Sequence, residues 1–376
     1  MMKITYPHMG TLTLVAEQLI EGMGQESVTP HRPTRQTLAL GARYAPEFAC
    51  IPFKLCLGTY LEGLSRGADT IVSGGGYGPC RAGLYGEIHR RILNDLGYDP
   101  RIIFFWPPLK KPVDFIKKLS LLKGHHSWIG LAGIIRKAWA KLSALDEMEL
   151  LAQDIRAREL KKGETSRAFN RGAAYLDSAR SLVEIKEAHE AALQELHKID
   201  LDEEADPLKV GIVGEIYVQL EPFANLYVEE TLGEMGVHVR RSIYLTSYTK
   251  HDVLSTRGDL RSKKLARSYL PQLIGGHGQN SVGDVIRYSR TGYDGVVQLA
   301  PFTCIPEIVA KSLMPYLSRE YDIPVLTLFI DEQTGRTGAE TRLEAFVDLM
   351  LQRREKARSE VKEPAELPLS CAAPSL

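Results

Sequence analysis

The chain has no long hydrophobic run, no excess of charge of one sign and few cysteines. No apolar stretch approaches the roughly 20 residues that cross a bilayer, and residues 1–7 lack the apolar core of a signal peptide. Basic and acidic residues number 47 each among 376, so no global field attracts nucleic acid or an anionic membrane. Five cysteines in so large a chain do not make a disulfide framework. We therefore expect a cytoplasmic protein with no nucleic-acid and no membrane partner.

Two nucleotide-binding motifs are also missing. The sequence has no Gly-x-x-x-x-Gly-Lys-Ser/Thr phosphate loop and no strict Gly-x-Gly-x-x-Gly fingerprint. Direct ATP hydrolysis and dinucleotide redox chemistry are therefore unsupported. If ATP drives the activity, a separate protein should hydrolyse it.

Strand and helix signals alternate in residues 1–111 and again in residues 207–355. This alternation predicts an α/β fold with mostly parallel sheets covered by helices. Strands are expected at Lys3–Tyr6, Asp69–Ser73, Arg101–Trp106, Val210–Val218, Val237–Leu245, Gly295–Ala300 and Val325–Phe329. Helices are expected at Leu12–Met23, after Cys50, and at Cys80–Leu96, Phe223–Gly236, Gly276–Tyr288, after Cys304 and at Thr341–Arg354.

Residues 112–206 have no strand signal and are rich in Ala, Leu, Glu, Lys and Arg. Apolar residues at helical spacing predict helices at Trp128–Leu145, Met148–Leu160 and Ser166–Lys198. Their Glu/Lys-rich face is either a solvated helix surface, the simpler reading, or a basic docking face for an acidic partner. Residues 356–376 have several prolines and no core pattern, which predicts a flexible tail. Cys371 lies in this tail and is not expected to be a ligand.

The pentapeptide Phe-x-Cys-Ile-Pro occurs twice, at 48–52 and 302–306. A proline two residues after a cysteine suits the first turn of a helix, where a missing N–H does no harm. Cys50 and Cys304 are thus expected at helix N-termini, where free N–H groups and the helix dipole favour a thiolate. Two thiolates presented identically from distant halves of the chain suggest a metal or iron–sulfur site between two domains.

A third cysteine, Cys80, follows a predicted strand and the glycine-rich turn 74–79. Glycines let the backbone approach a bulky ligand closely. Three such cysteines can bind three irons of a four-iron cubane. Cys56 is interpreted as a buried core thiol, with a place in the cluster pocket or a role as alternative ligand left open.

Several motifs together resemble the 2-hydroxyacyl-CoA dehydratase superfamily, and more specifically its activase-related proteins that accompany ATP-dependent reductases. The motifs are residues 49–55 with Gly58, 78–81 with Gly83 and Tyr85, 214–217 with Phe223 and Asn225, 275–278 with 281–283, 301–307, and 331–332 leading to 341–346. They cover nearly the whole chain except the helical middle and the tail.

The resemblance implies two doubly wound, flavodoxin- or Rossmann-like domains with a helical insertion and an iron–sulfur cluster at the domain interface. It implies that Cys50, Cys80 and Cys304 ligate a [4Fe-4S] cluster whose fourth iron can bind water, a sulfur species or substrate. Relatives also carry a double cubane. One chain has too few thiols for that, although two subunits of a homodimer sharing a cluster have enough. An ATP-hydrolysing activator is the partner that the resemblance implies.

Charged and polar residues near these motifs are further candidates. Lys54 and Arg81 would offset cluster charge or bind an anionic substrate, or else be exposed partners of surface acids. His277 would be a proton donor beside the cluster, or a surface histidine in a glycine-rich turn. Glu215 and Tyr217 end a strand on the side where α/β domains bind ligands.

Two more residues, Gln298 and Glu307, are placed similarly, and Glu307 would alternatively only cap its helix. Zinc is the main rival metal, because three cysteines with His277 or His8 would complete a tetrahedral site. The absence of any Cys-x-x-Cys pair among the three ligand candidates favours iron–sulfur.

Three functions follow from these candidates. The first is a redox protein that accepts a low-potential electron from an ATPase partner and reduces a small substrate or passes the electron on. The second is a catalytic subunit of a 2-hydroxyacyl-CoA dehydratase acting on an acyl-CoA. The third is a non-enzymatic cluster scaffold or structural metal protein.

Overall fold

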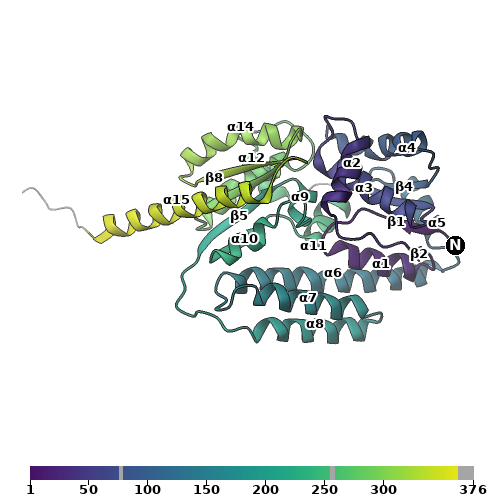
Figure 1. Cartoon of the computed structure of the whole chain (residues 1–376), viewed down its shortest axis with the longest axis horizontal. Helices are drawn as coiled ribbons and strands as arrows, with labels where there is room; N and C mark the ends of the chain where they lie inside the picture. The colour runs from purple at the N-terminus through teal and green to yellow at the C-terminus, as the bar shows by residue number, and fades with distance from the viewer. Residues whose placement is uncertain (76–78, 255–258, 363–376) are drawn as a thin grey trace, which may run out of the picture.

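The computed structural model describes residues 1–75, 79–254 and 259–362, and contains two four-stranded parallel sheets (Figure 1). The first sheet has the order β2-β1-β3-β4 and the second the order β6-β5-β7-β8, with all neighbours parallel. The strands are β1 (Lys3–Thr5), β2 (Glu26–Ser27), β3 (Thr70–Gly74), β4 (Arg101–Phe105), β5 (Leu208–Gly214), β6 (Val237–Arg241), β7 (Gly295–Pro301) and β8 (Val325–Ile330). The predicted α/β class with two parallel-sheet halves is confirmed.

The two halves share one topology. In each, the chain starts in an inner strand, moves outward to one edge, and then returns across the sheet to the other side. Ligands of such sheets bind outside the carboxyl ends of the strands, where the strand order reverses. This places β1 with β3, and β5 with β7, at the two candidate crevices.

The first sheet is covered by helices that span the region from the N-terminus to the helical middle. They are α1 (Leu12–Gly22), α2 (Arg35–Tyr44), α3 (Ile51–Ser65), the 3₁₀ turn η1 (Arg81–Leu84), α4 (Tyr85–Asp95) and α5 (Pro112–Leu122). Helix α3 is buried along nearly its whole length. Gly41 and Gly58 allow α2 to approach it, because a Cβ at Gly41 would lie 1.7 Å from the carbonyl oxygen of Lys54.

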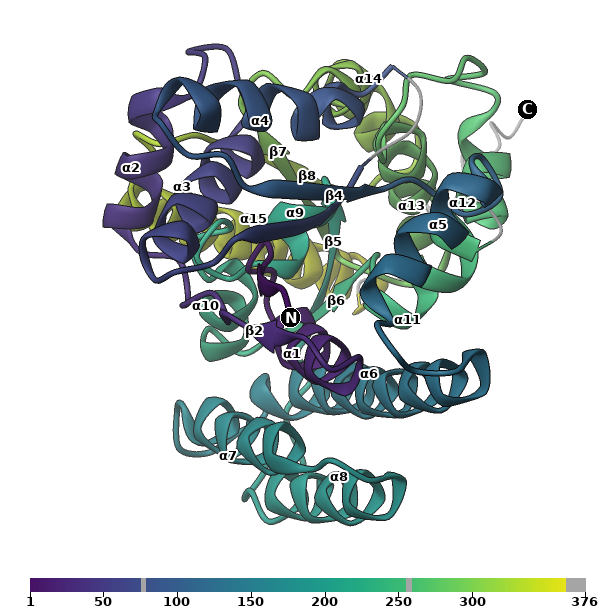
Figure 2. The ribbon, with the colours of Figure 1, turned by 90° about the vertical axis from the view of Figure 1, so that its right-hand side faces the viewer.

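The helical middle forms a layer beneath the two α/β halves (Figure 2). It consists of α6 (Trp128–Arg156), α7 (Glu164–Ser178) and α8 (Leu182–His197). The two helices predicted for 128–160 are one continuous helix of 29 residues. The predicted helix Ser166–Lys198 is divided, because Ser181 and Glu184 form a capping box that starts α8.

The second sheet is covered by α9 (Ile216–Leu220), α10 (Val228–Glu234), α11 (Leu245–Tyr248), the π-helical turn η2 (Thr249–Leu254), α12 (Leu260–Ala266), α13 (Gly278–Arg290), α14 (Ile305–Glu320) and α15 (Arg336–Lys362). The predicted strand Val210–Val218 ends at Gly214, whose φ of +137° ends the regular strand conformation. Tyr217 therefore lies on a helix. The predicted helix Phe223–Gly236 is shortened to α10.

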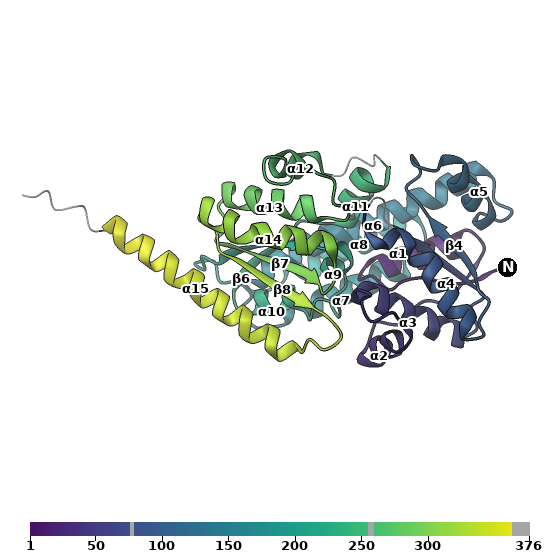
Figure 3. The same ribbon diagram turned by 90° about the horizontal axis from the view of Figure 1, so that it is seen from above.

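Helix α15 continues beyond the predicted start of the tail at residue 356 and ends at Lys362 (Figure 3). The predicted boundary of the tail is therefore wrong by several residues. Its remainder, 363–376 with Cys371, lies outside the described residues, as do 76–78 of the glycine-rich turn.

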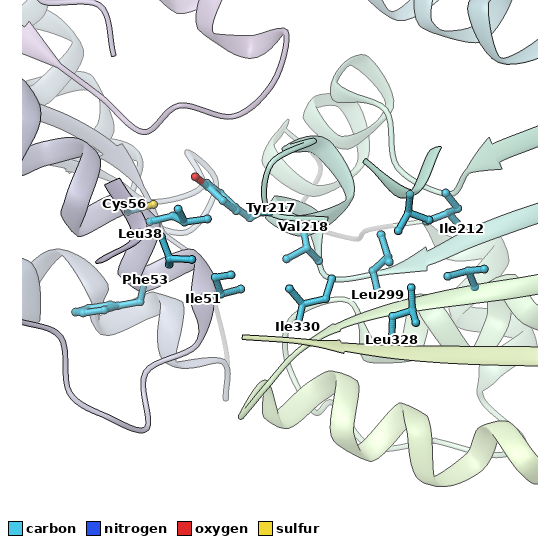
Figure 4. Packing of buried hydrophobic residues seen from close by; sticks show 14 of the residues in the cluster. Leu38, Ile51, Phe53, Cys56, Ile212, Tyr217, Val218, Leu299, Leu328 and Ile330 are labelled. Atoms are coloured by element: carbon cyan, nitrogen blue, oxygen red, sulfur yellow. The ribbon is translucent and has the colours of Figure 1, made fainter. Parts of the chain in front are cut away.

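Apolar side chains join the two α/β halves in one core. Figure 4 shows Leu38, Ile51 and Cys56 of the first half facing Tyr217, Val218 and Ile330 of the second, and all six are buried. A polar contact lies beside them, since Nδ1 of His8 is 2.6 Å from Oε2 of Glu221. In the part of the chain that the structure describes, no helix is both long enough and apolar enough to cross a membrane.

Candidate functional site

Cys50, Cys80 and Cys304 each occupy the N-cap position of a helix, namely α3, η1 and α14. Each has extended backbone dihedral angles, as N-cap residues do. The proline that follows Cys50 and Cys304 in each motif lies in the first helical turn. The predicted helix N-terminal positions are confirmed. All four described cysteines are free thiols.

Arg81 joins the three cysteine segments. Its guanidinium donates hydrogen bonds to the carbonyl oxygens of Phe48, at 3.1 Å, and of Thr303. The hydroxyl of Thr303 donates in turn to the same Phe48 oxygen, at 2.8 Å. Phe48 lies two residues before Cys50, Thr303 one residue before Cys304, and Arg81 one residue after Cys80. The three segments therefore meet around one side chain.

A glycine-rich loop packs against two of these segments. A Cβ at Gly275 would lie 2.6 Å from the backbone nitrogen of Cys80, and one at Gly278 would lie 2.4 Å from the carbonyl oxygen of Pro306. Gly275 and Gly276 also have φ values of +78° and +49°, which L side chains rarely adopt. The loop thus needs glycine both for its conformation and for its contact with the Cys80 and Cys304 segments.

Burial decides the charge state of the metal-free thiols. It raises the pKa of Cys50 to about 11 and also raises the pKa values of Cys80 and Cys304. A charged Glu215 raises the pKa of all three thiols further. Burial therefore opposes the thiolate form that the helix N-termini favour at these three cysteines.

Glu215 is the acid–base group shared by the thiols. It is the N-cap residue of α9, and its Oε2 accepts from the backbone N–H of Val218 at 3.1 Å. Burial raises its pKa to about 7. Its charge raises the pKa of Cys50, Cys56, Cys80 and Cys304, so Glu215 lies near all four described cysteines.

Two tyrosines flank the thiols. The Tyr85 hydroxyl contacts Sγ of Cys50. The Tyr217 side chain is buried, and its hydroxyl has no hydrogen-bond partner among the described residues. In Figure 4 this hydroxyl points toward the first half of the chain, near Cys56. A buried hydroxyl without a partner is uncommon and marks a position where a ligand atom or water would complete it.

Glu307 lies in a buried polar network at the start of α14. Its carboxylate accepts from the Ser281 hydroxyl at 3.0 Å and from the Gln298 amide at 2.9 Å. Gln298 accepts in turn from the hydroxyl of Thr327 at 2.9 Å. Burial raises the pKa of Glu307 to about 7. Gln298 and Glu307 are fully buried, so they hold the start of α14 in place and do not line an open cleft.

Lys54 and Arg81 differ from surface cations. Lys54 is buried, and its Nζ is 2.6 Å from Oε1 of Glu332 in the other half of the chain. Arg81 is engaged with backbone oxygens, and its charge lowers the pKa of Cys80. The reading of both residues as exposed partners of surface acids is thus wrong. Their positions agree with a role for Arg81 in offsetting negative charge and give Lys54 a place in joining the two halves.

His277 is the N-cap residue of α13 and is buried beside Tyr248, with 5.8 Å between the ring centroids. The reading as a surface histidine is therefore wrong. Burial lowers its pKa to about 4, so it is neutral at neutral pH. A neutral imidazole is able to donate a hydrogen bond but has no extra proton to release.

Cys56 lies in α3, buried in the core shared by the two halves. The interpretation as a core thiol agrees with this position. Burial raises the pKa of Cys56, and the charge of nearby Glu215 raises it further.

The two Phe-x-Cys-Ile-Pro copies are not equivalent in the fold. Cys50 begins α3, which lies between β2 and β3 in the chain. Cys304 begins α14, which lies between β7 and β8, the third and fourth strands of the second sheet in chain order. By topology, Cys304 corresponds to Cys80, and His277 of α13 corresponds to Cys50. The two cysteines therefore occupy the same position in their helices, the N-cap, but the two helices follow different strands of their sheets.

Soft sulfur donors at helix N-termini are the groups that these segments offer to a metal. Among the described residues, no three Cys, His, Asp or Glu side chains are grouped as ligands of one ion. His8, one proposed zinc ligand, is hydrogen-bonded to Glu221. Thiols that each bind a different iron of a cubane stand farther apart than ligands of one ion, and soft sulfur donors at helix N-termini suit such a cluster.

Apolar side chains border the cysteine segments on the outside. The aromatic residue of each repeated motif is exposed, with Phe48 at 65% and Phe302 at 55%. Leu84, after Cys80, and Ile305, after Cys304, are exposed as well. We call these four residues the apolar rim.

Sequence reasoning missed three residues of this site. Tyr85 and Glu332 stand within the motifs that carry the resemblance, yet nothing near them in the chain indicates their contacts with Cys50 and Lys54. Thr303 has a φ of +67°, a left-handed conformation that is rare for a β-branched residue and that points to a functional constraint. Scans of the chain against protein-family models and against curated proteins returned no match.

Proposed function

We propose that this protein is an iron–sulfur redox protein whose [4Fe-4S] cluster is held by Cys50, Cys80 and Cys304 between the two α/β halves. The observation that carries the proposal is the bridge made by Arg81, which ties the residues beside the three cysteines to one another. Nothing in the covalent sequence brings these segments together. A network that orients ligand-bearing loops in this way is typical of metal centres.

Three features of the chain would suit it to a negatively charged cluster. The N-termini of α3 and α14 supply free N–H groups and the positive end of a helix dipole. Arg81 supplies a full positive charge next to Cys80. Gly275 and Gly276 keep the backbone close to the Cys80 and Cys304 segments without side-chain bulk.

A bound cluster would supply one-electron transfer and one iron without a protein thiolate. Glu215 and Tyr217 are the chain's own groups for a substrate at that position. The Glu215 carboxyl would hold or release a proton, and the unpartnered Tyr217 hydroxyl would donate a hydrogen bond. Neutral His277 belongs to the glycine-rich loop and would support the loop conformation from its buried position.

The electron would come from a separate ATP-hydrolysing activator and would reduce a small substrate or be passed on. Absence of a phosphate loop from the sequence and presence of the apolar rim support a partner of this kind. An exposed apolar patch next to a redox centre gives a partner protein a surface to contact.

The test is an iron and sulfide count on protein purified without oxygen, together with its electronic spectrum. About four irons and four sulfides per chain are expected. Each single replacement of Cys50, Cys80 or Cys304 by Ala should abolish binding of the cluster. Cys56→Ala is the matched control and should still bind it. One zinc per chain without sulfide, or equal loss in all four variants, would overturn the proposal.

Activity then separates the redox protein from the acyl-CoA dehydratase. Reduction of the cluster by a purified ATPase activator, without any acyl-CoA, is expected for the redox protein. Turnover that requires a 2-hydroxyacyl-CoA would identify a dehydratase subunit instead. A loaded protein that no activator reduces would leave only the scaffold role.

A further inference from the structure

Positive charge is concentrated in one segment of this otherwise balanced chain. Residues 109–137 contain seven lysines and arginines and one acidic residue, Asp114. The segment covers the loop after β4, helix α5 and the first turns of α6. Its charge is concealed in the total composition, which is neutral.

Helix α5 is apolar on both of its faces. The inner face packs on the first sheet, where the rings of Phe115 and Phe105 lie 5.3 Å apart and Leu122 is buried. The outer face carries Val113 and Ile116, which are 65% and 53% exposed. Packing in the core explains why the inner face of α5 is apolar, but it does not explain the exposed apolar residues of the outer face.

The exposed apolar side chains continue across the loop into α6. Trp128 and Ile129, at the start of α6, are 51% and 86% exposed. We call the following set the basic–apolar patch, together with the lysines between its members: Leu109, Val113, Ile116, Leu121, Trp128 and Ile129. These six exposed apolar side chains all lie in one segment, residues 109–129, and exposed apolar side chains that form a patch mark an interaction surface.

Cations are held among these apolar side chains. Nζ of Lys111 lies 4.6 Å from the ring centroid of Trp106, and Nζ of Lys123 lies 5.4 Å from that of Trp128. Lys117 and Arg136 are exposed on the two helices. Lys111 and Lys123 are thus placed next to aromatic rings, as cations are on helices that lie in the headgroup region of a bilayer.

A cavity of about 440 Å³ adjoins the patch and is lined by Leu121 of the patch and by Arg101, His125 and His126. A cationic side chain and two imidazoles are suitable partners for an anionic headgroup. Figures 1 and 3 place α5 at the end of the molecule opposite α15. The C-terminal end of α15 therefore points away from the patch.

We propose that the basic–apolar patch binds the surface of a bilayer that contains anionic phospholipids. Lysine is depleted in protein–protein interfaces, whereas most cations of this segment are lysines. A second copy of the chain would bring the same positive charge against it, which disfavours a dimer through this face. Trp, Leu and Ile interleaved with Lys are the composition of an interfacial helix. This proposal, which rests on local charge, differs from the expectation, drawn from the neutral total charge, that no membrane is a partner.

The experiment is sedimentation of the purified full chain with vesicles of phosphatidylcholine alone and of phosphatidylcholine with phosphatidylglycerol. We expect binding only to the anionic vesicles, weakened by salt, with a blue shift of tryptophan fluorescence as Trp128 enters the interface. The variant Ile116→Ser/Lys117→Ser/Ile129→Ser should bind at least about tenfold more weakly. A matched control, Val183→Ser/Lys186→Ser, removes an exposed apolar residue and a lysine from α8 and should bind like the unchanged protein.

Each other outcome would overturn the proposal. No binding to anionic vesicles, or equal binding to both kinds of vesicle, would mean that the patch does not recognise an anionic bilayer. Equal weakening by the α8 control would mean that the binding is not at the patch. Binding of an acidic polypeptide such as poly-L-glutamate that the patch variant loses, without vesicle binding, would assign the patch to an acidic protein. Circular dichroism of each variant identifies a loss caused by misfolding, in which case the single substitution Ile129→Ser replaces the triple variant.

Discussion

The guanidinium of Arg81 is hydrogen-bonded to both the carbonyl oxygen and the hydroxyl of Thr303, 222 residues away in the chain. This contact connects the Cys80 segment of the first half to the Cys304 segment of the second. It also occurs at a residue with left-handed backbone, where the surrounding structure must stabilise the strained conformation.

Loss of this bridge should weaken cluster binding more than folding. Arg81→Ala is expected to lower the affinity for the cluster by about tenfold or more, because residues that orient metal ligands have effects of this size. The measurement is the iron content after challenge with a chelator. Arg91→Ala is the control, since Arg91 is exposed and forms an ion pair with Glu87 in its own helix. Equal iron loss in both variants would contradict a specific role for Arg81.

The ion pair between Lys54 and Glu332 predicts an asymmetry in stability. The Lys54 side chain is 4% exposed, whereas that of Glu332 is 29% exposed. Glu332→Gln leaves a buried cation without its partner and should lower the free energy of unfolding by about 3 kcal/mol. Lys54→Met leaves a carboxylate that water can reach, and its effect should be smaller. Urea unfolding of both variants measures this, and the reverse order would contradict the argument.

Tyr217→Phe should separate function from stability. The Tyr217 hydroxyl has no partner among the described residues, so its removal should leave the free energy of unfolding unchanged or raise it by about 1 kcal/mol. If the hydroxyl serves a substrate, turnover should fall while iron content is kept. A clear loss of stability would show that the hydroxyl has a structural partner, and unchanged turnover would remove it from the proposed site.

Buried His89 predicts a loss of stability in acid. It stacks on Phe53 with 4.0 Å between the ring centroids, and burial lowers its pKa from 6.5 to about 4. The unfolded chain therefore binds the proton more tightly, and the stabilisation is complete above pH 6.5 and is lost as the pH falls toward 4. Between about pH 7 and pH 5, protonation of His89 should lower the free energy of unfolding by about 2 kcal/mol.

Urea unfolding at both pH values measures this loss. His89→Gln should reduce the loss, although it will also lower the stability at neutral pH. Buried His277 has a lowered pKa as well, so part of the acid sensitivity should remain in the variant. An unchanged pH dependence in His89→Gln would contradict the assignment.

The apolar rim predicts a defect in partner-dependent reduction. Phe48→Ser/Phe302→Ser removes exposed rings that do not belong to the core, so iron content should be kept. Reduction by the activator should fall by about tenfold, because buried aromatic residues dominate the energy of protein interfaces. Leu349→Ser, at an exposed position on α15, is the control. Normal reduction of the double variant would exclude the rim as the contact surface.

Local chemistry in the sequence determined much of the framework. Alternation of apolar strands and amphipathic helices predicted the α/β class, and the Cys-Ile-Pro motifs predicted N-cap positions for Cys50 and Cys304, since proline is favoured in the first helical turn. Element ends depended on weaker local signals. Gly214 ended a predicted strand early, and Ser181 with Glu184 divided a predicted helix.

Only the tertiary structure decided what surrounds each of these residues. The sequence suggested thiolates, whereas burial raises the pKa of these thiols, because desolvation depends on atoms from distant segments. The sequence also allowed Lys54 to be an exposed cation, whereas in the structure Lys54 is buried and paired with Glu332 of the second half of the chain. The two motif copies look identical in sequence but begin helices at different positions of their sheets, because strand order is set by long-range pairing and not by local pattern.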